Sequence, residues 1–549
     1  MANFLLNISI LFALLATVNC NLDAGSSSNE KKKLKVLVNN PGLSFSHMQF
    51  QGKLADVLVE AGHEVHVLLF EQNPLVGDYN GTFKAHRIIR GSMSQQKKDE
   101  FLKIPAFSKP FEGTTNWFSN GLMENFRVMM ANLCEDIVRL HQPLLRELAK
   151  ENYDVGISES YDPCFFGILH AVGVKTKIGT FAIATTNWAG GPFGVPNIPS
   201  FVINFFAPSI SGPNMNFWER TLNFYSFAQE YFQERDKIYS IEQQYFNDAY
   251  GPEFPSLWSI AKSVSLCFVN GNEFFELPRP LSNKIIHIGG IATGVFEKAP
   301  AKKVTLSPEI QPIFENTKDG VVLFSFGTLT NTKVMSQEMK MAFLKAFTQF
   351  PTYDFIWKID QNENDSELFS NAPNVHIFEW FNQKAILAQP KLKAFITHCG
   401  LNSMNEAASE GVPMIGIPLF GDQAFNAAII SHKKSGVYVD ILDMYTENKG
   451  SKVLTDALNK VLHLPEYSHN AKVVQKKLMS MPFKPKEKFV KWIEFAAQFS
   501  DLDELNLPTK DEMSLFVYYS LDVISFSVVV FSVLIFLLLI IIHQICGRK

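Results

Sequence analysis

A group of polar residues stands in an otherwise apolar stretch of the second half of the chain. The stretch from Phe395 to Asn426 reads FITHCGLNSMNEAASEGVPMIGIPLFGDQAFN. His398 follows one strand-like run, Gly400 precedes a helix-like segment, and Asp422 and Gln423 follow a second strand-like run. In open α/β sheets, ligands bind beyond the carboxyl ends of the strands. These polar residues are therefore candidates for ligand binding rather than parts of a solvated face.

The helix-like segment after His398 predicts an anion site. Gly400, Asn402 and Ser403 stand where this helix begins, and the free N–H groups of a helix N-terminus bind phosphate. The segment could therefore hold a pyrophosphate. In the alternative interpretation Asn402 or Ser403 merely caps the helix, with Ser403 and Glu406 forming a capping box.

Two neighbouring strand ends supply the remaining parts of a nucleotide-sugar site. Trp380 and Gln383 follow the expected strand 374–378, and a Trp at that position offers a face on which a base can stack. Asp422 and Gln423 offer oxygens that accept hydrogen bonds from sugar hydroxyls. The sequence contains no Walker-type or G-x-G-x-x-G loop that would compete for the nucleotide.

A candidate general base lies near the start of the chain. His47 follows the strand-like run Lys35–Asn39 and opens a helix expected from about His47 to Ala61, with Ser46 and Gln49 as its capping box. The positive helix end disfavours imidazolium, so we expect a neutral ring that can accept a proton. Judged by position alone, a loop histidine without a role is the commoner interpretation.

Such a base usually has a carboxylate that orients it. The strand-like run Tyr153–Ser158 ends in Glu159, and Asp162 follows shortly after it. We expect Glu159 to orient His47, and Asp162 is the alternative.

Apolar runs alternate with helix-like segments along the chain. Continuous runs rich in Val, Ile and Phe are typical of strands buried on both faces, and their alternation with helices predicts parallel sheets. We expect α/β architecture with two Rossmann-like doubly wound domains, one spanning residues 21–290 and one spanning 291–500, that face a cleft. The expected strands are 35–39, 64–70, 153–158, 176–182, 263–270, 285–289, 321–326, 353–359, 374–378, 393–397 and 413–418.

Both ends of the chain have features of a membrane protein. Residues 1–20 have the layout of a cleaved signal peptide. After a linker at 501–522, the stretch 523–542 is apolar throughout and long enough to span a bilayer. Arg548 and Lys549 in the tail 543–549 favour its cytosolic placement.

The composition excludes some classes of protein. The chain has 549 residues, 46% of them hydrophobic, and a formal net charge of −4, which argues against disorder and against a nucleic-acid partner. Its 49 Phe residues pack a core or line an apolar cavity. Cys134, Cys164, Cys267 and Cys399 show no metal-ligand spacing, so we expect buried thiols, with one disulfide possible.

These motifs together resemble the membrane-anchored animal UDP-glucuronosyltransferases, a branch of the UDP-glycosyltransferases with the GT-B fold. The resemblance covers nearly the whole chain and is most specific between Trp380 and Gln423. It implies that Trp380 stacks on uracil, that Gln383 contacts the uridine part, and that Glu406 binds the ribose hydroxyls. It further implies that the pyrophosphate is held by His398, Asn402 and Ser403, and the donor sugar by Asp422 and Gln423.

The resemblance also assigns residues outside that signature. Gly327 and Thr328, after the run 321–326, resemble the family's turn near the phosphates. His47 matches the catalytic histidine, and Glu159 aligns with the Asp that holds it. Three positions depart from the family pattern: Asn382 replaces a usual Pro, Cys399 a usual Gly, and Ala385 a common Asp.

The function implied is the inverting transfer of glucuronic acid from UDP-glucuronate to a hydroxyl, or a similar nucleophile, of small lipophilic acceptors. The UDP-sugar is a co-substrate, and neither a cofactor nor a metal is expected, because no Asp-x-Asp motif ends a strand of the donor domain. The aromatic stretch Phe181–Phe232 is expected to form the acceptor pocket or to touch the membrane surface. The alternatives are a UDP-glucosyltransferase and a membrane protein that binds UDP-sugars or lipids without turnover.

The resemblance places the protein in the endoplasmic reticulum membrane as a single-pass type I protein with lumenal catalytic domains, alone or as a homo- or hetero-oligomer. The plasma membrane is the alternative, because the tail shows no evident dilysine signal. Asn80 and Asn364 begin glycosylation sequons on the lumenal side.

Overall fold

The computed structural model describes residues 32–104, 109–112, 121–185, 190–204, 211–230, 235–296, 305–328, 330–362, 365–509 and 512–547. The expected signal peptide and the two tail cations, Arg548 and Lys549, lie outside the described residues, as does Asn364 of the second sequon.

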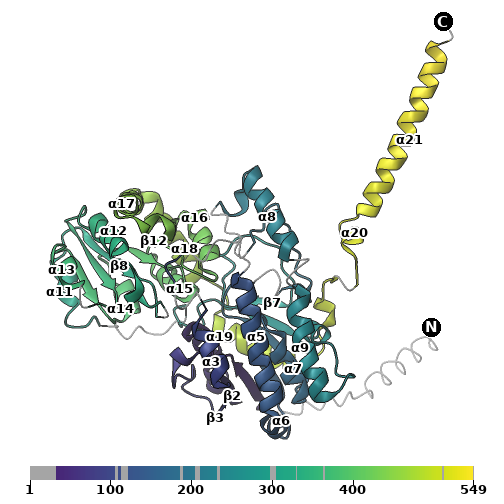
Figure 1. Cartoon of the computed structure of the whole chain (residues 1–549), viewed down its shortest axis with the longest axis horizontal. Coiled ribbons are helices and arrows are strands. Elements are labelled where there is room, and N and C mark those ends of the chain that lie inside the picture. The colour runs from purple at the N-terminus through teal and green to yellow at the C-terminus, as the bar shows by residue number, and fades with distance from the viewer. Residues whose placement is uncertain are drawn as a thin grey trace, which may run out of the picture. The chain divides into compact units, whose positions relative to one another are not determined.

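The first domain contains a seven-stranded, wholly parallel sheet in the order β3-β2-β1-β4-β5-β6-β7 (Figure 1). All the strands expected up to residue 289 are present, and β3 is an additional edge strand. The strands are β1 (Lys35–Asn40), β2 (Glu64–Glu71), β3 (Arg87–Ser92), β4 (Val155–Glu159), β5 (Thr176–Phe181), β6 (Leu266–Val269) and β7 (Ile285–His287).

Helices cover both faces of this sheet. One face packs on α2 (Phe45–Glu60) and α19 (Pro485–Gln498), and the other on α5 (Gly121–Leu140), α7 (Pro163–Ala171), α9 (Arg235–Tyr250) and α10 (Leu257–Lys262). Helix α19 lies in the range expected for the second domain, yet its buried side chains Phe489, Ile493 and Ala496 belong to the core of the first sheet.

The second domain contains a six-stranded parallel sheet in the order β10-β9-β8-β11-β12-β13. All its expected strands are present, and the short β13 is additional. The strands are β8 (Gly320–Ser325), β9 (Tyr353–Lys358), β10 (Val375–Phe378), β11 (Leu392–Thr397), β12 (Met414–Gly416) and β13 (Gly436–Tyr438).

Helices sandwich the second sheet in the same way. Helices α12 (Gln337–Phe347) and α17 (Glu447–His463) cover one face, and α15 (Leu401–Glu410), α16 (Gln423–His432) and α18 (Pro465–Met479) cover the other. The remaining α-helices among the described residues are α3 (Gln95–Leu102), α6 (Gln142–Ala149), α8 (Phe217–Gln229), α11 (Gln311–Asn316), α13 (Asp365–Ser370), α14 (Gln383–Leu387), α20 (Leu515–Tyr518) and α21 (Leu521–Cys546).

Both sheets are doubly wound, and each has one point at which the strand order reverses. In the first sheet β1 lies beside β4, and in the second β8 lies beside β11. A crevice forms beyond the carboxyl ends of the strands at such a reversal, because the connections leave it in opposite directions. The residues that follow β1, β4, β8 and β11 are therefore the ones that the fold offers to a ligand.

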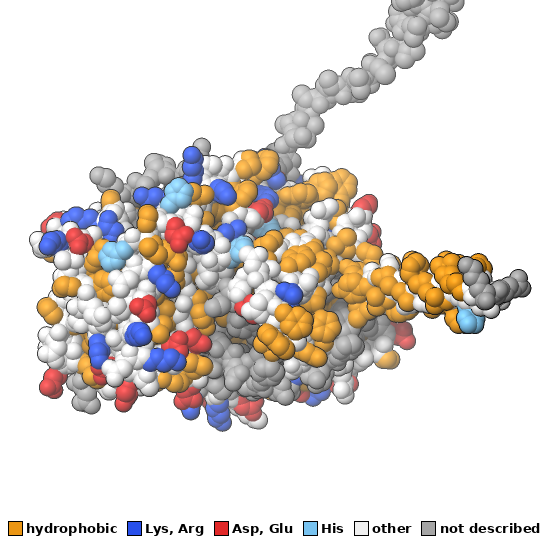
Figure 2. Space-filling view, turned by 90° about the horizontal axis from the view of Figure 1, so that it is seen from above, with side chains coloured by type: hydrophobic (Ala, Val, Ile, Leu, Met, Phe, Trp, Pro, Cys, Tyr) orange, Lys and Arg blue, Asp and Glu red, His pale blue; other side chains and the backbone are white. Residues whose placement is uncertain are grey.

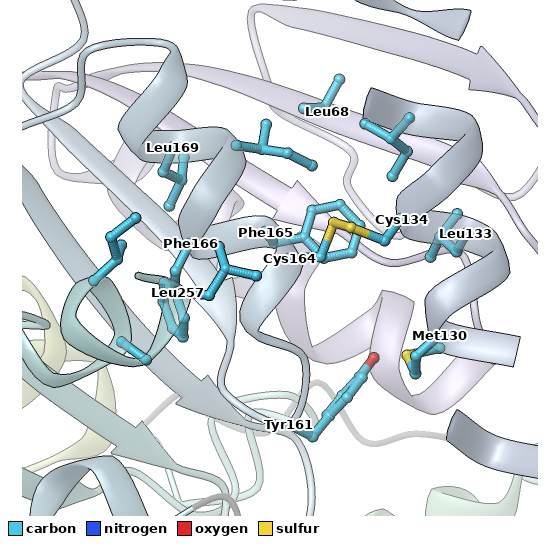
Figure 3. Packing of buried hydrophobic residues seen from close by; sticks show 14 of the residues in the cluster. Leu68, Met130, Leu133, Cys134, Tyr161, Cys164, Phe165, Phe166, Leu169 and Leu257 are labelled. Carbon is cyan, nitrogen blue, oxygen red and sulfur yellow. A yellow bond between two sulfur atoms is a disulfide. The ribbon is translucent and has the colours of Figure 1, made fainter. Parts of the chain in front are cut away.

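Many of the Phe side chains pack the two cores. Phe324, for example, stacks on Trp357 with ring centroids 4.9 Å apart, and Phe347 stacks on Phe355 at 4.2 Å. A disulfide joins Cys134 of α5 to Cys164 of α7 in the core of the first domain (Figure 3). The expectation of buried cysteines with one disulfide is thus confirmed, since the free Cys267 and Cys399 are also buried.

Helix α21 contains the stretch expected to cross a membrane. Its most apolar 18-residue window has a mean hydropathy of 3.1, and none of that window is buried against the protein. Among the described residues this is the one helix whose length and composition fit a membrane span.

Candidate active site

His47 and Glu159 meet at the reversal point of the first sheet. His47 lies in the first turn of α2, which follows β1, and Glu159 is the last residue of β4. Nδ1 of His47 lies 2.7 Å from Oε2 of Glu159, and the other oxygen of Glu159 accepts a hydrogen bond from the backbone N–H of Ala182 at 2.8 Å. A carboxylate only accepts, so Nδ1 carries the hydrogen and Nε2 is left to take a proton.

The start of α2 differs from the expectation in one detail. The helix begins at Phe45 with Ser44 as its N-cap, and no side chain caps it. The predicted capping box of Ser46 and Gln49 is therefore wrong, while His47 keeps its place near the helix N-terminus.

The electrostatics of His47 also differ from the expectation. Burial by itself lowers the pKa of His47, but the charge and hydrogen bond of Glu159, with a smaller contribution from Asp422, raise it, and the net pKa lies above the ordinary value. The helix N-terminus by itself favours the neutral ring. The nearby carboxylates act in the opposite direction and hold the proton more tightly.

Asp162, the alternative partner of His47, is used elsewhere. It is the N-cap of α7, where its Oδ1 accepts the N–H of Cys164 at 2.9 Å. Burial raises its pKa, as it does that of Glu242. The aromatic ring of Tyr161, in contrast, packs edge-on against His47 with ring centroids 5.8 Å apart.

The loop after β11 places His398 behind an open helix N-terminus. Helix α15 begins at Leu401 with Gly400 as its N-cap, and no side chain caps it. The alternative in which Asn402 or Ser403 caps the helix is therefore excluded. The N–H groups of the first turn remain available to an anion.

His398 packs against two glycines and is held in its neutral form. A Cβ on Gly327 would lie 2.7 Å from Cε1 of His398, and a Cβ on Gly400 would lie 2.6 Å from its Nε2. Only glycine lets the ring approach both backbones this closely. Burial, together with the charge of Lys358, lowers the pKa of His398 to about 4.

Three of the predicted residues form one hydrogen-bonded group. Nε2 of Gln383 donates to Oγ of Ser403 at 3.2 Å and to Oε2 of Glu406 at 2.7 Å. Burial raises the pKa of Glu406. Trp380 lines the same cavity as this group and is 71% exposed, so its ring offers an open face.

Lys358, the last residue of β9, was not predicted from the sequence. Its Nζ lies 4.7 Å from the centre of the Trp380 ring and donates to the carbonyl of Gly327 at 2.8 Å. Burial lowers the pKa of Lys358. An ammonium group thus lies between the expected base platform and the expected phosphate turn, and the strand-end rule used for the other residues would have found it.

Asp422 and Gln423 stand at the start of α16. Oε1 of Gln423 accepts the backbone N–H groups of Leu419 and Phe420 at 2.7 and 3.1 Å, so the oxygen is committed to the loop and the NH2 group is the part left to donate. Asp422 is half-buried, and its partial burial raises its pKa.

Asn426, a second residue that was not predicted from the sequence, fixes Asp422. Its Nδ2 donates to Oδ2 of Asp422 at 2.6 Å and to the carbonyl of Cys399 at 2.9 Å. One side chain thereby links the sugar-binding candidate to the loop that begins α15. The spacing of four residues on one helix was the available signal.

Asn402 connects the two domains. Its Nδ2 donates to Oε1 of Gln49 at 3.2 Å, and its Oδ1 accepts from Nδ2 of Asn270 at 3.0 Å. Both partners belong to the first domain, and neither contact was predicted from the sequence.

A cavity of about 1000 Å³ brings these residues together. His47 lines it from the first domain, and Glu159 stands behind His47. All the predicted residues of the second domain line it: Gly327, Thr328, Trp380, Gln383, His398, Gly400, Asn402, Ser403, Glu406, Asp422 and Gln423.

The apolar wall of this cavity comes from other parts of the first domain than expected. It is formed by Leu43, Phe45, Tyr79, Ile104 and Met129. Of the described residues in the stretch 181–232, only Ala182 and Ile183 line the cavity. That stretch therefore contributes less of this cavity than its aromatic composition indicated, because Phe193 and Phe227 pack into the interior.

Comparisons with known proteins agree with this architecture. A family model described as "UDP-glucoronosyl and UDP-glucosyl transferase" matches residues 34–548. A Caenorhabditis elegans relative that carries the name UDP-glucuronosyltransferase ugt-48 is 30% identical over 509 residues, which cover 89% of this chain and 91% of the relative. UDP-glucuronosyltransferase 3A1 of Bos taurus is 28% identical, with 88% of each chain covered.

Solved structures show the same fold. A UDP-glucose:anthocyanidin 3-O-glucosyltransferase in complex with UDP superposes with a TM-score of 0.55 at 16% identity, over 85% of this chain and 100% of that one. The calicheamicin glycosyltransferase CalG4 superposes with a TM-score of 0.56 at 13% identity, over 85% of this chain and 99% of that one. The two parallel α/β domains are thus those of the GT-B fold.

Proposed function

Because this chain belongs to the UDP-glucuronosyl and UDP-glucosyl transferase family, we propose that it transfers a sugar from a UDP-sugar to a hydroxyl group of a small lipophilic molecule, with inversion at the anomeric carbon. UDP-glucuronate is the proposed donor, in line with the names of the relatives, and UDP-glucose is the alternative. The observation that carries the proposal is that His47, backed by Glu159, shares one cavity with the nucleotide-binding candidates.

In this mechanism His47 acts as the general base. Its Nε2 takes the proton of the acceptor hydroxyl while the acceptor oxygen attacks the anomeric carbon from the face opposite UDP. The new glycosidic bond forms as the bond from the anomeric carbon to the diphosphate oxygen breaks, and UDP leaves with the bonding electrons. Glu159 holds the ring by Nδ1 and stabilises the imidazolium that forms.

The second domain binds the nucleotide and stabilises the leaving group. Trp380 stacks on the base, and the group around Gln383 and Glu406 holds the nucleoside. The first turn of α15 and the ammonium of Lys358 lie where the diphosphate gains negative charge as it departs. Donors placed in advance around a developing charge lower the barrier without reorganisation.

The first domain binds the acceptor. The apolar wall near His47, from Phe45, Tyr79, Ile104 and Met129, suits a small lipophilic molecule whose hydroxyl points at the base. Holding donor and acceptor together in one cavity supplies part of the rate enhancement, because the reaction between them then no longer requires a bimolecular encounter.

The proposed location follows from helix α21. We propose that α21 crosses the membrane of the endoplasmic reticulum and that both domains lie in the lumen, with the plasma membrane as the alternative. The disulfide of Cys134 and Cys164 is consistent with an oxidising compartment.

The test is an assay of membranes that contain the full chain. A panel of phenols and steroids is incubated with UDP-glucuronate or with UDP-glucose, and conjugates are followed by mass and by the NMR coupling of the anomeric proton. A β-linked product from one donor supports the proposal and identifies that donor. If neither donor gives product while UDP still raises the thermal midpoint, the protein is a binder and the proposed transfer is wrong.

A further inference from the structure

Helix α8 carries an exposed apolar face. Five of its large hydrophobic side chains are exposed, each by more than half: Phe217 (62%), Trp218 (73%), Leu222 (55%), Phe224 (56%) and Tyr225 (66%). At 100° per residue these positions fall within about 160° of the helix circumference. We call them the outer face of α8. The surfaces of soluble proteins rarely gather so many large apolar side chains, so this face is a candidate for contact with a membrane or a protein partner.

The opposite face of α8 is fixed to the first domain. Asn223 is buried and accepts the backbone N–H of Asn204 at 2.7 Å, and its Nδ2 donates to the carbonyls of Pro199 and Val202 at 2.7 and 2.8 Å. A capping box of Asn216 and Glu219 closes the helix N-terminus. The outer face is thus exposed by a well-anchored helix and not by a frayed one.

The same loop that holds α8 also holds the chain just before α21. Oη of Tyr519 donates to the carbonyl of Asn197 at 3.2 Å, and α21 begins two residues later, at Leu521. The loop that contains Asn197 and Pro199 therefore contacts both Tyr519, just before α21, and Asn223 of α8.

The segment before α21 is fastened to the first domain at three points. Oγ of Ser265 donates to the carbonyl of Ser500 at 2.7 Å, Oγ of Ser282 donates to that of Leu505 at 3.1 Å, and Lys262 pairs with Glu512. A span connected by a loose linker would leave the body free to tumble above the bilayer. The fastened segment instead sets a fixed distance between the first domain and the point where α21 enters the membrane.

We propose that the outer face of α8 lies in the headgroup region of the bilayer that α21 crosses, and that it is a second point of membrane contact for the catalytic body. The inference goes beyond the proposed reaction and rests only on α21 being a membrane span.

The chemistry of the outer face fits a lipid surface. Trp218 and Tyr225 have amphipathic rings of the kind that concentrate at membrane interfaces, and the apolar side chains between them suit the boundary of headgroups and acyl chains. Figure 2, which views the molecule from the side toward which α21 extends in Figure 1, shows apolar side chains gathered around the foot of that helix.

The test uses the full chain in lipid nanodiscs with Cys546 replaced by Ser, so that a new surface cysteine can carry an environment-sensitive fluorophore. The probe positions are Leu222→Cys on α8 and Val530→Cys on α21, and the control is Met341→Cys, an exposed apolar residue of α12 in the second domain. Leu222 and Met341 line no part of the cavity, so transferase activity in detergent is expected to be unchanged in both variants. Lipids that carry a nitroxide near the headgroup serve as quenchers.

The expected result is that nitroxide lipids reduce the emission of the label at position 222 at least about twofold, reduce that at 530, and leave that at 341 unchanged. A label at 222 that stays as bright as the one at 341, while the label at 530 is quenched, would overturn the proposal and leave the anchor intact. The label at position 222 could also report an apolar environment without being quenched by the nitroxide lipids. That result would point to a protein partner or a second copy and would also overturn the proposal. An unquenched label at 530 would remove the anchor, and the proposal with it, while leaving the proposed reaction untouched.

Discussion

Nδ1 of His47 lies 2.7 Å from Oε2 of Glu159, although the two residues are 112 positions apart in the chain. The order of the first sheet explains the contact, because β1 and β4 are neighbours at its reversal point. The pair faces the second domain, where Asp422 contributes to the raised pKa of His47. A base, its orienting carboxylate and a sugar-binding candidate are thus assembled from three distant parts of the sequence.

The raised pKa of His47 predicts the pH dependence of the transfer. The base works only in its neutral form, so kcat/KM is expected to fall as the pH drops through the pKa of His47, which lies above its usual value of 6.5. Glu159→Gln removes the charge that raises this pKa. The acid limb of the profile is therefore expected to move to lower pH, with a maximal rate reduced roughly 10²- to 10⁴-fold.

Asp162→Asn is the matched control for that experiment, because Asp162 is the nearby carboxylate that caps α7. Asn also serves as an N-cap, so the acid limb is expected to stay where it is in the wild type. If the acid limb instead moves with Asp162→Asn and not with Glu159→Gln, then Asp162 and not Glu159 orients His47, and our assignment is wrong.

Lys358 is expected to act on the diphosphate and not on the nucleoside. Replacing it by Met removes a charged hydrogen-bond donor from the cavity, which typically costs about 1.5–3 kcal/mol, or roughly 10- to 150-fold in affinity for UDP. The affinity for uridine, measured by calorimetry on the same protein, is expected to change little. Lys345→Met, on the exposed part of α12, serves as the control. Equal losses for UDP and uridine would show that Lys358 acts on the base instead.

The packing of His398 against Gly327 gives a steric test of the phosphate site. Gly327→Ala places a Cβ 2.7 Å from the ring of His398 and also strains a backbone with φ of +81°. We expect the affinity for UDP to fall by more than about tenfold. Gly294→Ala separates the two effects, because its φ of +69° imposes similar strain but its Cβ meets nothing within 4 Å. Similar losses in both variants would mean that the contact with His398 is unimportant.

The disulfide is expected to stabilise the first domain. It closes a loop with a sequence separation of 30 residues, and such a link contributes roughly 3 to 4 kcal/mol. Cys134→Ser with Cys164→Ser is therefore expected to lower the thermal midpoint by about 5 °C or more, measured by scanning fluorimetry. Cys267→Ala, which removes a buried but unpaired thiol, is expected to lower it far less. Equal shifts would mean that packing and not the crosslink accounts for the effect.

The rule that ligands bind beyond strand ends recovered most of this site from the sequence. It selected His47, His398 and Asp422, and the structure brings all three to one cavity. The strands themselves were visible because both faces of each sheet are covered, which makes their apolar runs continuous. Two of the four edge strands, β3 and β13, were not visible: β3 reads RIIRGS, with two charged side chains, and β13 has only three residues.

The contacts between domains could not be predicted from periodicity. Gln49 and Asn270 meet Asn402 only because the two sheets face each other at a particular angle and distance, and no local pattern encodes that placement. The raised pKa of His47 has the same origin, since it depends on Glu159 and Asp422 from other segments. The exposed outer face of α8 was likewise hidden in an aromatic stretch whose other members, such as Phe193 and Phe227, are buried.

The central claim is that His47 is the general base. Its most direct test compares turnover and UDP affinity of the wild-type protein, His47→Ala and His47→Gln, with the UDP-sugar that proves to be the active donor. The account predicts that both variants lose roughly 10²- to 10⁴-fold in kcat while UDP binds with unchanged affinity, because His47 does not contact the nucleotide-binding group. A variant that retains full turnover at unchanged UDP affinity would contradict the assignment of His47 as the base.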